Sequence, residues 1–177
     1  MNICVFCSAS DVAPTYSGPA VELATLIARG RHGFVWGGSD EGLMKIMADA
    51  VQGEGGTIIG VSMEFLKHKA RKNADEMIIA KDLGARKAAL LARADALVVL
   101  VGGIGTLDEM AQVLELKKHG QHKKPIAVLN TENFYQGLQT QLKRMEEEGF
   151  LPETLDELVY FARTPQEVMR YIAEHGN

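Results

Sequence analysis

The stretch Ala96-Leu-Val-Val-Leu-Val-Gly-Gly-Ile-Gly-Thr-Leu-Asp-Glu109 decides the fold of this chain. Its first six residues are apolar at every position, which is typical of a parallel strand covered on both faces. The glycines that follow predict a tight turn, and the amphipathic segment Thr106–His119 predicts a helix after it. A buried strand that passes through a glycine turn into a helix is the repeating unit of α/β folds.

The same alternation of strand and helix continues through all 177 residues without a linker or an internal repeat. Strands separated by helices require crossover connections, so the sequence predicts an α/β fold with a doubly wound, mostly parallel, Rossmann-like sheet. We expect one nucleotide-binding domain over residues 1–177. The expected strands are Ile3–Cys7, Gly33–Trp36, Thr57–Val61, Glu76–Ala80, Ala96–Val101, Ile126–Asn130 and Leu158–Phe161, and the expected helices are Tyr16–Arg29, Leu43–Gln52, Gly84–Arg93, Thr106–His119, Phe134–Glu148 and Pro165–Glu174.

Charge and hydropathy exclude several classes of protein. The net charge of −4 and the pI near 5.7 argue against a nucleic-acid partner, which usually meets a basic surface. The longest apolar run, Ala96–Gly105, is far shorter than the roughly 20 residues of a membrane span, and no secretory signal is apparent at the N-terminus. We therefore expect a cytoplasmic protein without a membrane partner, and any anionic ligand must be held locally by backbone amides and a few cations.

The two cysteines, Cys4 and Cys7, have the C-x-x-C spacing of some redox centres. Redox pairs of this kind begin a helix, whereas these two lie in a predicted strand, where residues three apart point to opposite faces. We expect both to be buried apolar residues in a reducing compartment. No cluster of histidine, cysteine and aspartate at ligand spacing predicts a metal site elsewhere.

The glycine turn after Ala96–Val101 has the properties of a phosphate site. Glycines at Gly102, Gly103 and Gly105 permit positive φ and a close approach of ligand to backbone. The free amides and the dipole of the following helix favour an anion, and Thr106 adds a hydroxyl. The alternative is a tight turn with a helix cap and no ligand. A dinucleotide site is not indicated, because Asp108 stands where the third glycine of G-x-G-x-x-G is required.

A second glycine turn, Gly37-Gly38-Ser39-Asp40-Glu41-Gly42-Leu43, lies at another predicted strand-to-helix junction. Its glycine spacing resembles an ATP-binding loop, but Leu43 occupies the place of the lysine. The turn either shares one ligand with the first turn or is a simple turn with Ser39 or Asp40 as N-cap. In doubly wound sheets, ligands bind outside the carboxyl ends of the strands, where both turns are expected.

These residues resemble the LOG family, the cytokinin riboside 5′-monophosphate phosphoribohydrolases often mislabelled lysine decarboxylases. The family pattern P-G-G-x-G-T-x-x-E is matched by Val101–Glu109, with valine in place of proline. The second glycine turn matches G-G-G-x-x-G-L-M-G in part, with Ser39 and Lys45 replacing glycines, and Cys7–Ser10 resembles the C-G-S-S turn with a serine at position 8. The Arg-Lys pair that opens the preceding helix in the family corresponds to Arg86 and Lys87.

The resemblance implies an N-glycosidic hydrolase without cofactor or metal. It would release the free base and ribose 5-phosphate from a nucleoside 5′-monophosphate, with a purine or N6-modified adenine as base. It also implies a homodimer or a larger homo-oligomer, for which the apolar side of Thr106–His119 offers Met110, Val113 and Leu114. The implied substrate-binding residues are Ser8, Gly37, Gly38, Ser39, Lys87, Gly102, Gly103, Gly105 and Thr106.

Glu109 and Arg86 are the candidate catalytic residues. Cleavage of an N-glycosidic bond builds positive charge on the ribose, which the carboxylate of Glu109 would stabilise. In the alternative reading, Thr106 and Glu109 form a capping box at the helix start. Arg86 would clamp the phosphate or orient Glu109, and Lys87 would add a point charge, unless both are solvated helix residues. Asp108 points about 100° away around the helix and is expected to be a surface acid.

Two other classes of function remain open at this point. The fold and a phosphate loop determine binding but not chemistry, so a non-catalytic carrier of a nucleotide or phosphorylated cofactor is the main alternative. The third class is a homo-oligomeric interaction protein with an idle pocket. The pair of Glu109 and Arg86 favours the enzyme, and the replacements at Ser39 and Lys45 favour the carrier.

Overall fold

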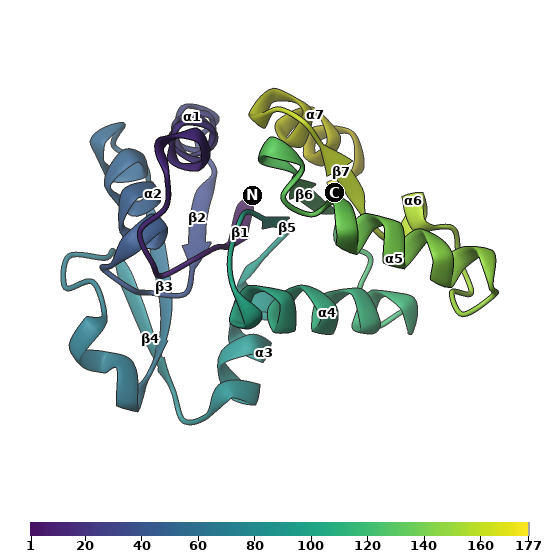
Figure 1. The fold of residues 1–177 in the computed structure, drawn as a ribbon. Coiled ribbons are helices and arrows are strands. Elements are labelled where there is room, and N and C mark those ends of the chain that lie inside the picture. The colour runs from purple at the N-terminus through teal and green to yellow at the C-terminus, as the bar shows by residue number, and fades with distance from the viewer. Residues whose placement is uncertain (177) are drawn as a thin grey trace.

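A seven-stranded sheet, in which every pair of neighbours is parallel, forms the centre of the computed structural model, which describes residues 1–176 (Figure 1). The strand order is β4-β3-β2-β1-β5-β6-β7. This confirms the predicted doubly wound α/β fold, with a sheet that is wholly parallel. The strands are β1 (Asn2–Phe6), β2 (Gly33–Trp36), β3 (Ile58–Met63), β4 (Glu76–Ala80), β5 (Ala96–Val99), β6 (Ile126–Leu129) and β7 (Tyr160–Ala162).

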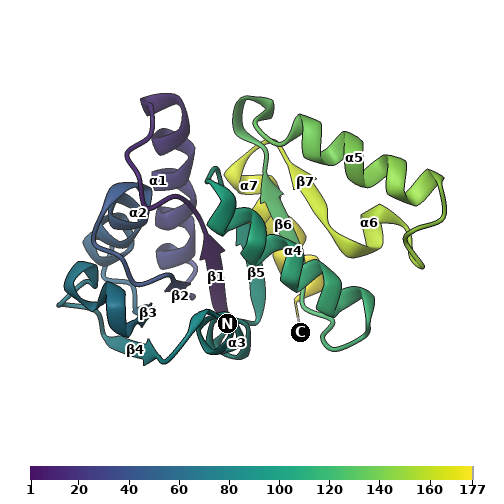
Figure 2. The same cartoon turned by 60° about the horizontal axis from the view of Figure 1, so that its bottom comes forward.

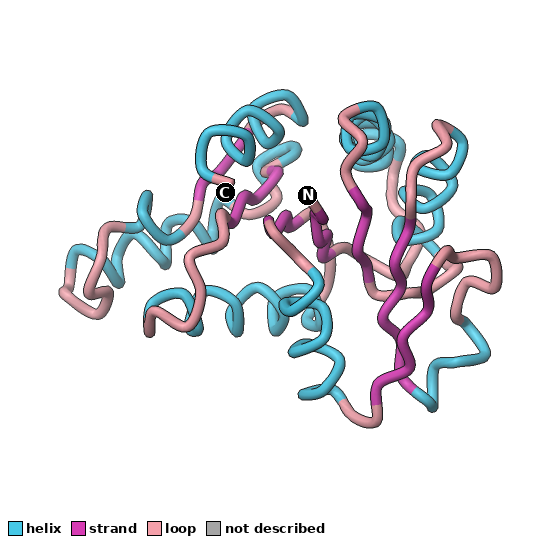
Figure 3. The backbone as a smooth tube through the Cα atoms, turned by 180° about the vertical axis from the view of Figure 1, so that it is seen from behind, coloured by secondary structure: helices cyan, strands magenta, loops and turns pink. Residues whose placement is uncertain are grey.

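Helices cover both faces of the sheet (Figure 2). Each face has its own apolar core. One face packs against α1 (Pro14–Arg29), α2 (Gly42–Gly53) and α7 (Pro165–His175). The other packs against α3 (Leu83–Arg93), α4 (Ile104–Lys118), α5 (Gln136–Glu147) and the short α6 (Leu155–Leu158). Figure 3 shows the same layers from behind, with the strands between the helices.

The predicted strands are all present, and the differences lie at the ends of elements and in short helices. Leu158 ends α6 instead of opening the last strand, because a capping box of Thr154 and Glu157 starts a helical turn there. Two 3₁₀ helices, η1 (Glu64–Lys69) and η2 (Thr131–Asn133), had no counterpart among the predicted elements.

The two cysteines confirm the strand reading of the N-terminus. Cys4 and Cys7 are buried and unpaired, and they belong to the cores on opposite faces of the sheet. They therefore fill space in the fold as apolar residues do. No helix within residues 1–176 combines the length and the hydropathy that a bilayer span requires.

The order of the strands places a switch point between β1 and β5. From β1 the chain adds β2, β3 and β4 in one direction, and it then returns to add β5, β6 and β7 on the other side. The loops after β1 and β5 consequently leave the sheet in opposite directions and open a crevice at its carboxyl edge. The glycine turn at Gly102–Gly105 and the turn at Cys7–Ser10 border this crevice.

Candidate active site at the carboxyl edge of the sheet

The start of α4 presents backbone amides that have no acceptor among residues 1–176. The N-cap is Gly103, which makes no side-chain cap, and the first helical hydrogen bond joins Leu107 N–H to Gly103 O at 3.1 Å. The amides of Ile104, Gly105 and Thr106 precede this bond, and within residues 1–176 no acceptor is paired with them. Gly103, Ile104 and Gly105 are also exposed. Free amides at an exposed start of a 15-residue helix form a site suited to phosphate.

The glycines of this turn are needed for space and access, not for positive φ as expected. Positive φ occurs at Gly38 and Gly42 of the other turn but not at Gly102, Gly103 or Gly105. A β-carbon at Gly102 would lie 2.1 Å from Thr106 Oγ1, so this glycine lets the buried threonine pack against the turn. At Gly103 and Gly105 a β-carbon would meet nothing within 4 Å. Because Gly103 and Gly105 have no side chain, the backbone amides at the start of α4 stay accessible to a ligand.

The second glycine turn is occupied by the chain itself. The Leu43 amide donates to Ser10 O at 3.2 Å and the Met44 amide donates to Ser8 O at 3.1 Å, so the loop after β1 takes the first-turn amides of α2. Gly42 allows this contact, because a β-carbon there would lie 2.4 Å from the Ala9 carbonyl oxygen. The start of α2 is therefore a structural junction between the β1 and β2 loops.

Neither Ser39 nor Asp40 is the N-cap of α2, which is Glu41 without a side-chain cap. The predicted cap is wrong because both residues are engaged in the turn that precedes the helix. Asp40 pairs with Arg71, and the backbone of Ser39 forms a bridge with Ala70. The Ser39 hydroxyl is buried and has no hydrogen-bond partner within the described part of the chain.

Arg71 is a buried cation that the sequence did not reveal. Its guanidinium donates to Asp40 Oδ1 at 2.7 Å, to Asp49 Oδ1 at 2.6 Å and to Gln52 Oε1 at 2.7 Å, while its amide donates to Gly38 O at 2.9 Å. It thereby fastens the second glycine turn to α2. The acceptors of its guanidinium lie 19 to 31 residues earlier in the chain, so no local pattern marks it.

Glu109 and Arg86 form a buried ion pair between α4 and α3. Arg86 Nη1 lies 2.7 Å from Glu109 Oε1, and the two residues are only 9% and 6% exposed. Arg86 also donates from Nε to Val61 O at 3.0 Å and from Nη2 to Gly37 O at 3.4 Å. Gly37 makes room for it, since a β-carbon there would lie 2.3 Å from Nη2. The pair thus joins the α4 start to the end of β3 and the second glycine turn.

The capping-box reading of Glu109 is wrong. The helix starts earlier than expected, at Ile104, so Gly103 is the N-cap and Glu109 lies beyond the first turn. Its carboxylate points to Arg86 and makes no hydrogen bond to the amide of Thr106. The residue is therefore available for a role other than capping.

Burial controls the electrostatics of this pair. It raises the pKa of the Glu109 carboxyl above its ordinary value of 4.5, and the Arg86 guanidinium opposes that rise. The negative charge of Glu109 in turn contributes to the raised pKa of the Cys7 thiol, after the larger effect of burial. Glu109 therefore lies close enough to interact electrostatically with Cys7, which is adjacent in sequence to Ser8. A carboxylate in such a low-dielectric setting interacts strongly with a positive charge that develops nearby.

Lys87 and Asp108 form a second ion pair on the same two helices. Lys87 Nζ lies 2.9 Å from both carboxylate oxygens of Asp108. Asp108 is a surface acid as predicted, with 54% of its side chain exposed. Lys87 is half-buried, so it is not the freely solvated residue of the alternative reading.

A hollow of about 300 Å³ lies at the switch point between β1 and β5. It brings together Ser8 and Gly102, two of the predicted binding residues, and the Ser8 amide donates to Val101 O at 3.1 Å across its floor. The other walls come from the loop before α1, from Tyr16 in the first turn of α1 and from Phe134, which follows η2. The full lining is Ser8, Asp11, Val12, Ala13, Tyr16, Val101, Gly102 and Phe134.

No group of three or more histidine, cysteine, aspartate or glutamate side chains within residues 1–176 is arranged to hold a metal ion. The polar groups at the carboxyl edge are instead backbone amides and two carboxylate–cation pairs. This set of groups suits an anionic organic ligand.

Comparison with known proteins finds similarity over nearly the whole chain. Residues 44–172 match the family model described as "Possible lysine decarboxylase". The chain is 32% identical to the cytokinin riboside 5′-monophosphate phosphoribohydrolase LOG7 of Arabidopsis thaliana, over 98% of this chain and 82% of that protein. It is 31% identical to LOG3 of the same plant, over 99% and 83% of the two chains.

Solved structures show the same fold in proteins with a different described role. The molybdenum cofactor carrier protein of Chlamydomonas reinhardtii superposes with a TM-score of 0.71 and 25% identity over 97% of each chain. The molybdenum cofactor binding protein of Rippkaea orientalis gives a TM-score of 0.76 at 23% identity, covering 97% of this chain and 94% of that one.

Proposed function

The chain belongs to the LOG family, and from this membership we propose that it hydrolyses the N-glycosidic bond of a purine nucleoside 5′-monophosphate. The observation that carries the proposal is the buried pair of Glu109 and Arg86 behind a helix start with free amides. A phosphate site next to a desolvated carboxylate is what this reaction requires.

In the proposed reaction, the bond between ribose C1′ and the base nitrogen breaks with its electron pair going to the base. Positive charge then develops on the ribose ring, as in other glycoside hydrolyses. The Glu109 carboxylate stabilises this charge and orients the attacking water. The water supplies a hydroxyl to C1′ and a proton that balances the base, which gives free base and ribose 5-phosphate.

Arg86 serves in this proposal as the group that holds Glu109. Each of its three guanidinium nitrogens already has an acceptor within the chain. Its role is therefore to fix the carboxylate and keep it ionised, more than to clamp phosphate. The phosphate itself is assigned to the start of α4, where Lys87 of α3 adds a positive charge beside its partner Asp108. The proposed binding set is Ser8, Gly37, Gly38, Ser39, Lys87, Gly102, Gly103, Gly105 and Thr106, in which Gly37 acts through the space it leaves for Arg86.

The direct test is incubation with a panel of nucleoside monophosphates, followed by chromatography for free base and ribose 5-phosphate. Release of equimolar base and sugar phosphate by the wild-type chain, and not by Glu109→Gln, is the expected result. Binding of a nucleotide without any release would contradict hydrolysis.

A non-catalytic carrier of a phosphorylated ligand is the second candidate. It is favoured by the similarity to the molybdenum cofactor carrier of Chlamydomonas reinhardtii and by Ser39 and Lys45, which stand where the LOG pattern has glycine. A carrier would retain the phosphate site and give no base release, so the same chromatographic experiment separates the two candidates.

Alanine at Gly103 or Gly105 is expected to weaken AMP binding about tenfold, equivalent to about 1.4 kcal/mol. The added β-carbon meets no atom of the chain within 4 Å, so it would interfere only with a ligand on the amides. Calorimetric titration with AMP would measure the affinity. Gly53→Ala, at an equally open site at the end of α2, is the matched control and should leave binding unchanged. Unaltered affinity in both turn variants would exclude the phosphate site.

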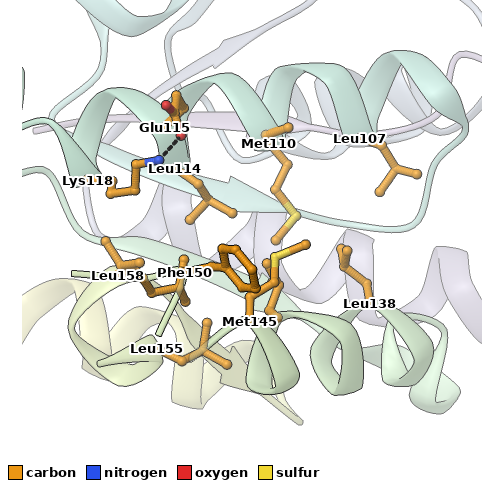
Figure 4. Close-up of a pocket in the computed structure, with 13 residues that line it drawn as sticks. Leu107, Met110, Leu114, Glu115, Lys118, Leu138, Met145, Phe150, Leu155 and Leu158 are labelled. Atoms are coloured by element: carbon orange, nitrogen blue, oxygen red, sulfur yellow. Dashed lines mark ion pairs between the residues drawn. The ribbon is translucent and has the colours of Figure 1, made fainter. Parts of the chain in front are cut away.

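We also propose that the protein forms a homodimer through an apolar groove between α4 and the α5–α6 region (Figure 4). The groove measures about 390 Å³, and Phe150 on its rim is 71% exposed. Of the residues expected on this side of α4, Val113 belongs to the core, whereas Met110 and Leu114 line the groove. Met110 is buried at its base and Leu114 is half-buried. An exposed ring beside an apolar groove is self-complementary under a two-fold axis, so a second copy is the occupant we propose.

Light scattering should therefore give a particle of about twice the 19.3 kDa chain mass at micromolar concentration. Phe150→Asp should shift the particle toward the monomer, because a charge on the rim would be buried unpaired in the dimer. Phe65→Asp, at an exposed phenylalanine on η1, is the control and should leave the mass unchanged. A wild-type particle of one chain mass would refute the dimer.

A further inference from the structure

The hollow at the β1–β5 switch point is walled by an aromatic pair. The ring of Phe134, just after η2, packs edge-on against Tyr16 at the start of α1, with centroids 5.9 Å apart and an angle of 80° between the planes. Phe134 nevertheless remains 46% exposed. The exposed part of this ring is therefore open to a flat ligand, and aromatic rings pack on one another in stacked or edge-on geometry.

The backbone before Phe134 is strained, and several contacts hold it in place. Glu132 and Asn133 adopt φ of 52° and 56°, two consecutive left-handed residues without a glycine. The Tyr135 amide donates to Asn130 Oδ1 at 2.7 Å, and the Tyr135 hydroxyl donates to Leu100 O at 2.7 Å. This hydroxyl bond ties the strained loop to the residue that precedes the first glycine turn. Strain that the surrounding structure holds in this way clusters at ligand sites.

Asp11 supplies the polar group of the hollow. It lies in its lining and makes no ion pair or side-chain hydrogen bond with any residue from 1 to 176. A carboxylate accepts hydrogen bonds and donates none, so it distinguishes an amino group from a carbonyl oxygen. The volume of about 300 Å³ is at the lower end of ligand pockets, which suits one ring system and not a whole nucleotide.

We propose that this hollow is the base subsite, in which the purine ring of a nucleoside monophosphate packs against Phe134 and directs an exocyclic amino group to Asp11. The inference rests on the proposed nucleotide-binding function. The phosphate lies at the amides of α4, and the ribose spans the Gly102 edge of the hollow. Stacking on an aromatic side chain recognises the face of the base, and the carboxylate recognises its edge.

The test compares two ligands that differ only in the presence of the base. Phe134→Ala should weaken AMP binding about tenfold in calorimetry and leave the affinity for ribose 5-phosphate unchanged, because the sugar phosphate does not reach the ring. Phe134→Tyr should retain wild-type affinity for AMP. Phe65→Ala, at the exposed phenylalanine of η1, should change neither affinity. Equal weakening of AMP and ribose 5-phosphate, or no weakening of AMP, would overturn the subsite.

The proposed contact between Asp11 and the amino group of the base is tested by comparing the affinities for AMP and inosine monophosphate. The wild-type protein should bind AMP at least tenfold more tightly than inosine monophosphate, whose carbonyl oxygen would face the Asp11 carboxylate. Asp11→Ala should reduce this preference to near unity. Equal affinity for the two nucleotides in the wild-type protein would overturn the assignment of Asp11. These are binding measurements, so they can succeed where no hydrolysis occurs, and they can fail in a protein that releases base.

Discussion

Glu109→Gln is expected to lower the rate of base release from a nucleoside monophosphate a hundredfold or more. Glutamine has the size of glutamate but cannot carry the negative charge that stabilises a ribosyl cation or takes a proton from water, and such acid–base roles contribute about 10²–10⁴-fold. Single-turnover measurement of base release at saturating substrate would show the loss in the chemical step. AMP affinity should persist, because the proposed phosphate and base contacts lie elsewhere.

The stability of this variant follows from the same burial. Because burial raises the pKa of Glu109 above its value of 4.5 in the unfolded chain, ionisation of this carboxyl costs some stability, which is lost as the pH rises from 4.5 through the folded pKa. Glutamine still offers Arg86 an oxygen, but it leaves the buried guanidinium without a counter-charge. The loss should therefore be about 3 kcal/mol, the lower end of the cost of breaking a buried ion pair.

Asp108→Asn is the matched control for Glu109→Gln. It removes the neighbouring carboxylate, which is 54% exposed, from the same helix. This variant should retain most of the activity. A Glu109→Gln variant as active as Asp108→Asn would show that Glu109 has only a structural role.

The sequence predicted the sheet well because its strands are short, continuous apolar runs. Ala96–Val99, for example, is fully buried on both faces, so no alternation of polar residues obscures it. The start of α4 was predicted less well, because Thr106 has the side chain of a typical N-cap. In the structure the helix begins two residues earlier, at Ile104, and its N-cap Gly103 makes no side-chain cap. Local propensity could not distinguish an uncapped helix start at Ile104 from a conventional cap at Thr106.

The parts of the site that depend on distant contacts could not be predicted. Arg86 was identified from its pairing with Lys87 and the family resemblance, but its acceptors on β3 and the second glycine turn are visible only in the fold. Phe134 was placed in an ordinary helix. Its exposure at the switch point depends on the strained residues before it and on the Tyr135 anchor, which joins positions 35 residues apart.

Arg86→Gln is expected to reduce activity at neutral pH and to shift the acidic limb of the pH–rate profile to higher pH. In the wild-type protein this limb should already lie above 4.5, the ordinary pKa of glutamate, because burial raises the pKa of Glu109. The Arg86 charge lowers that pKa, so its removal raises it further and leaves less ionised Glu109 at any given pH. The variant should also lose about 3–5 kcal/mol of stability, since one partner of a buried pair is left alone.

Arg86→Lys separates the charge from the geometry. A lysine restores a positive charge near Glu109 but cannot reach Val61 O, Gly37 O and the carboxylate together, as the planar guanidinium does. It should therefore return the acidic limb most of the way toward that of the wild type while recovering only part of the maximal rate. If both variants lower the rate uniformly across pH and leave the limb in place, Arg86 acts on the substrate and not through the ionisation of Glu109. Rate profiles from pH 4 to 9, with melting curves at each pH, would distinguish these outcomes, because loss of folded protein and loss of the ionised carboxylate follow different curves.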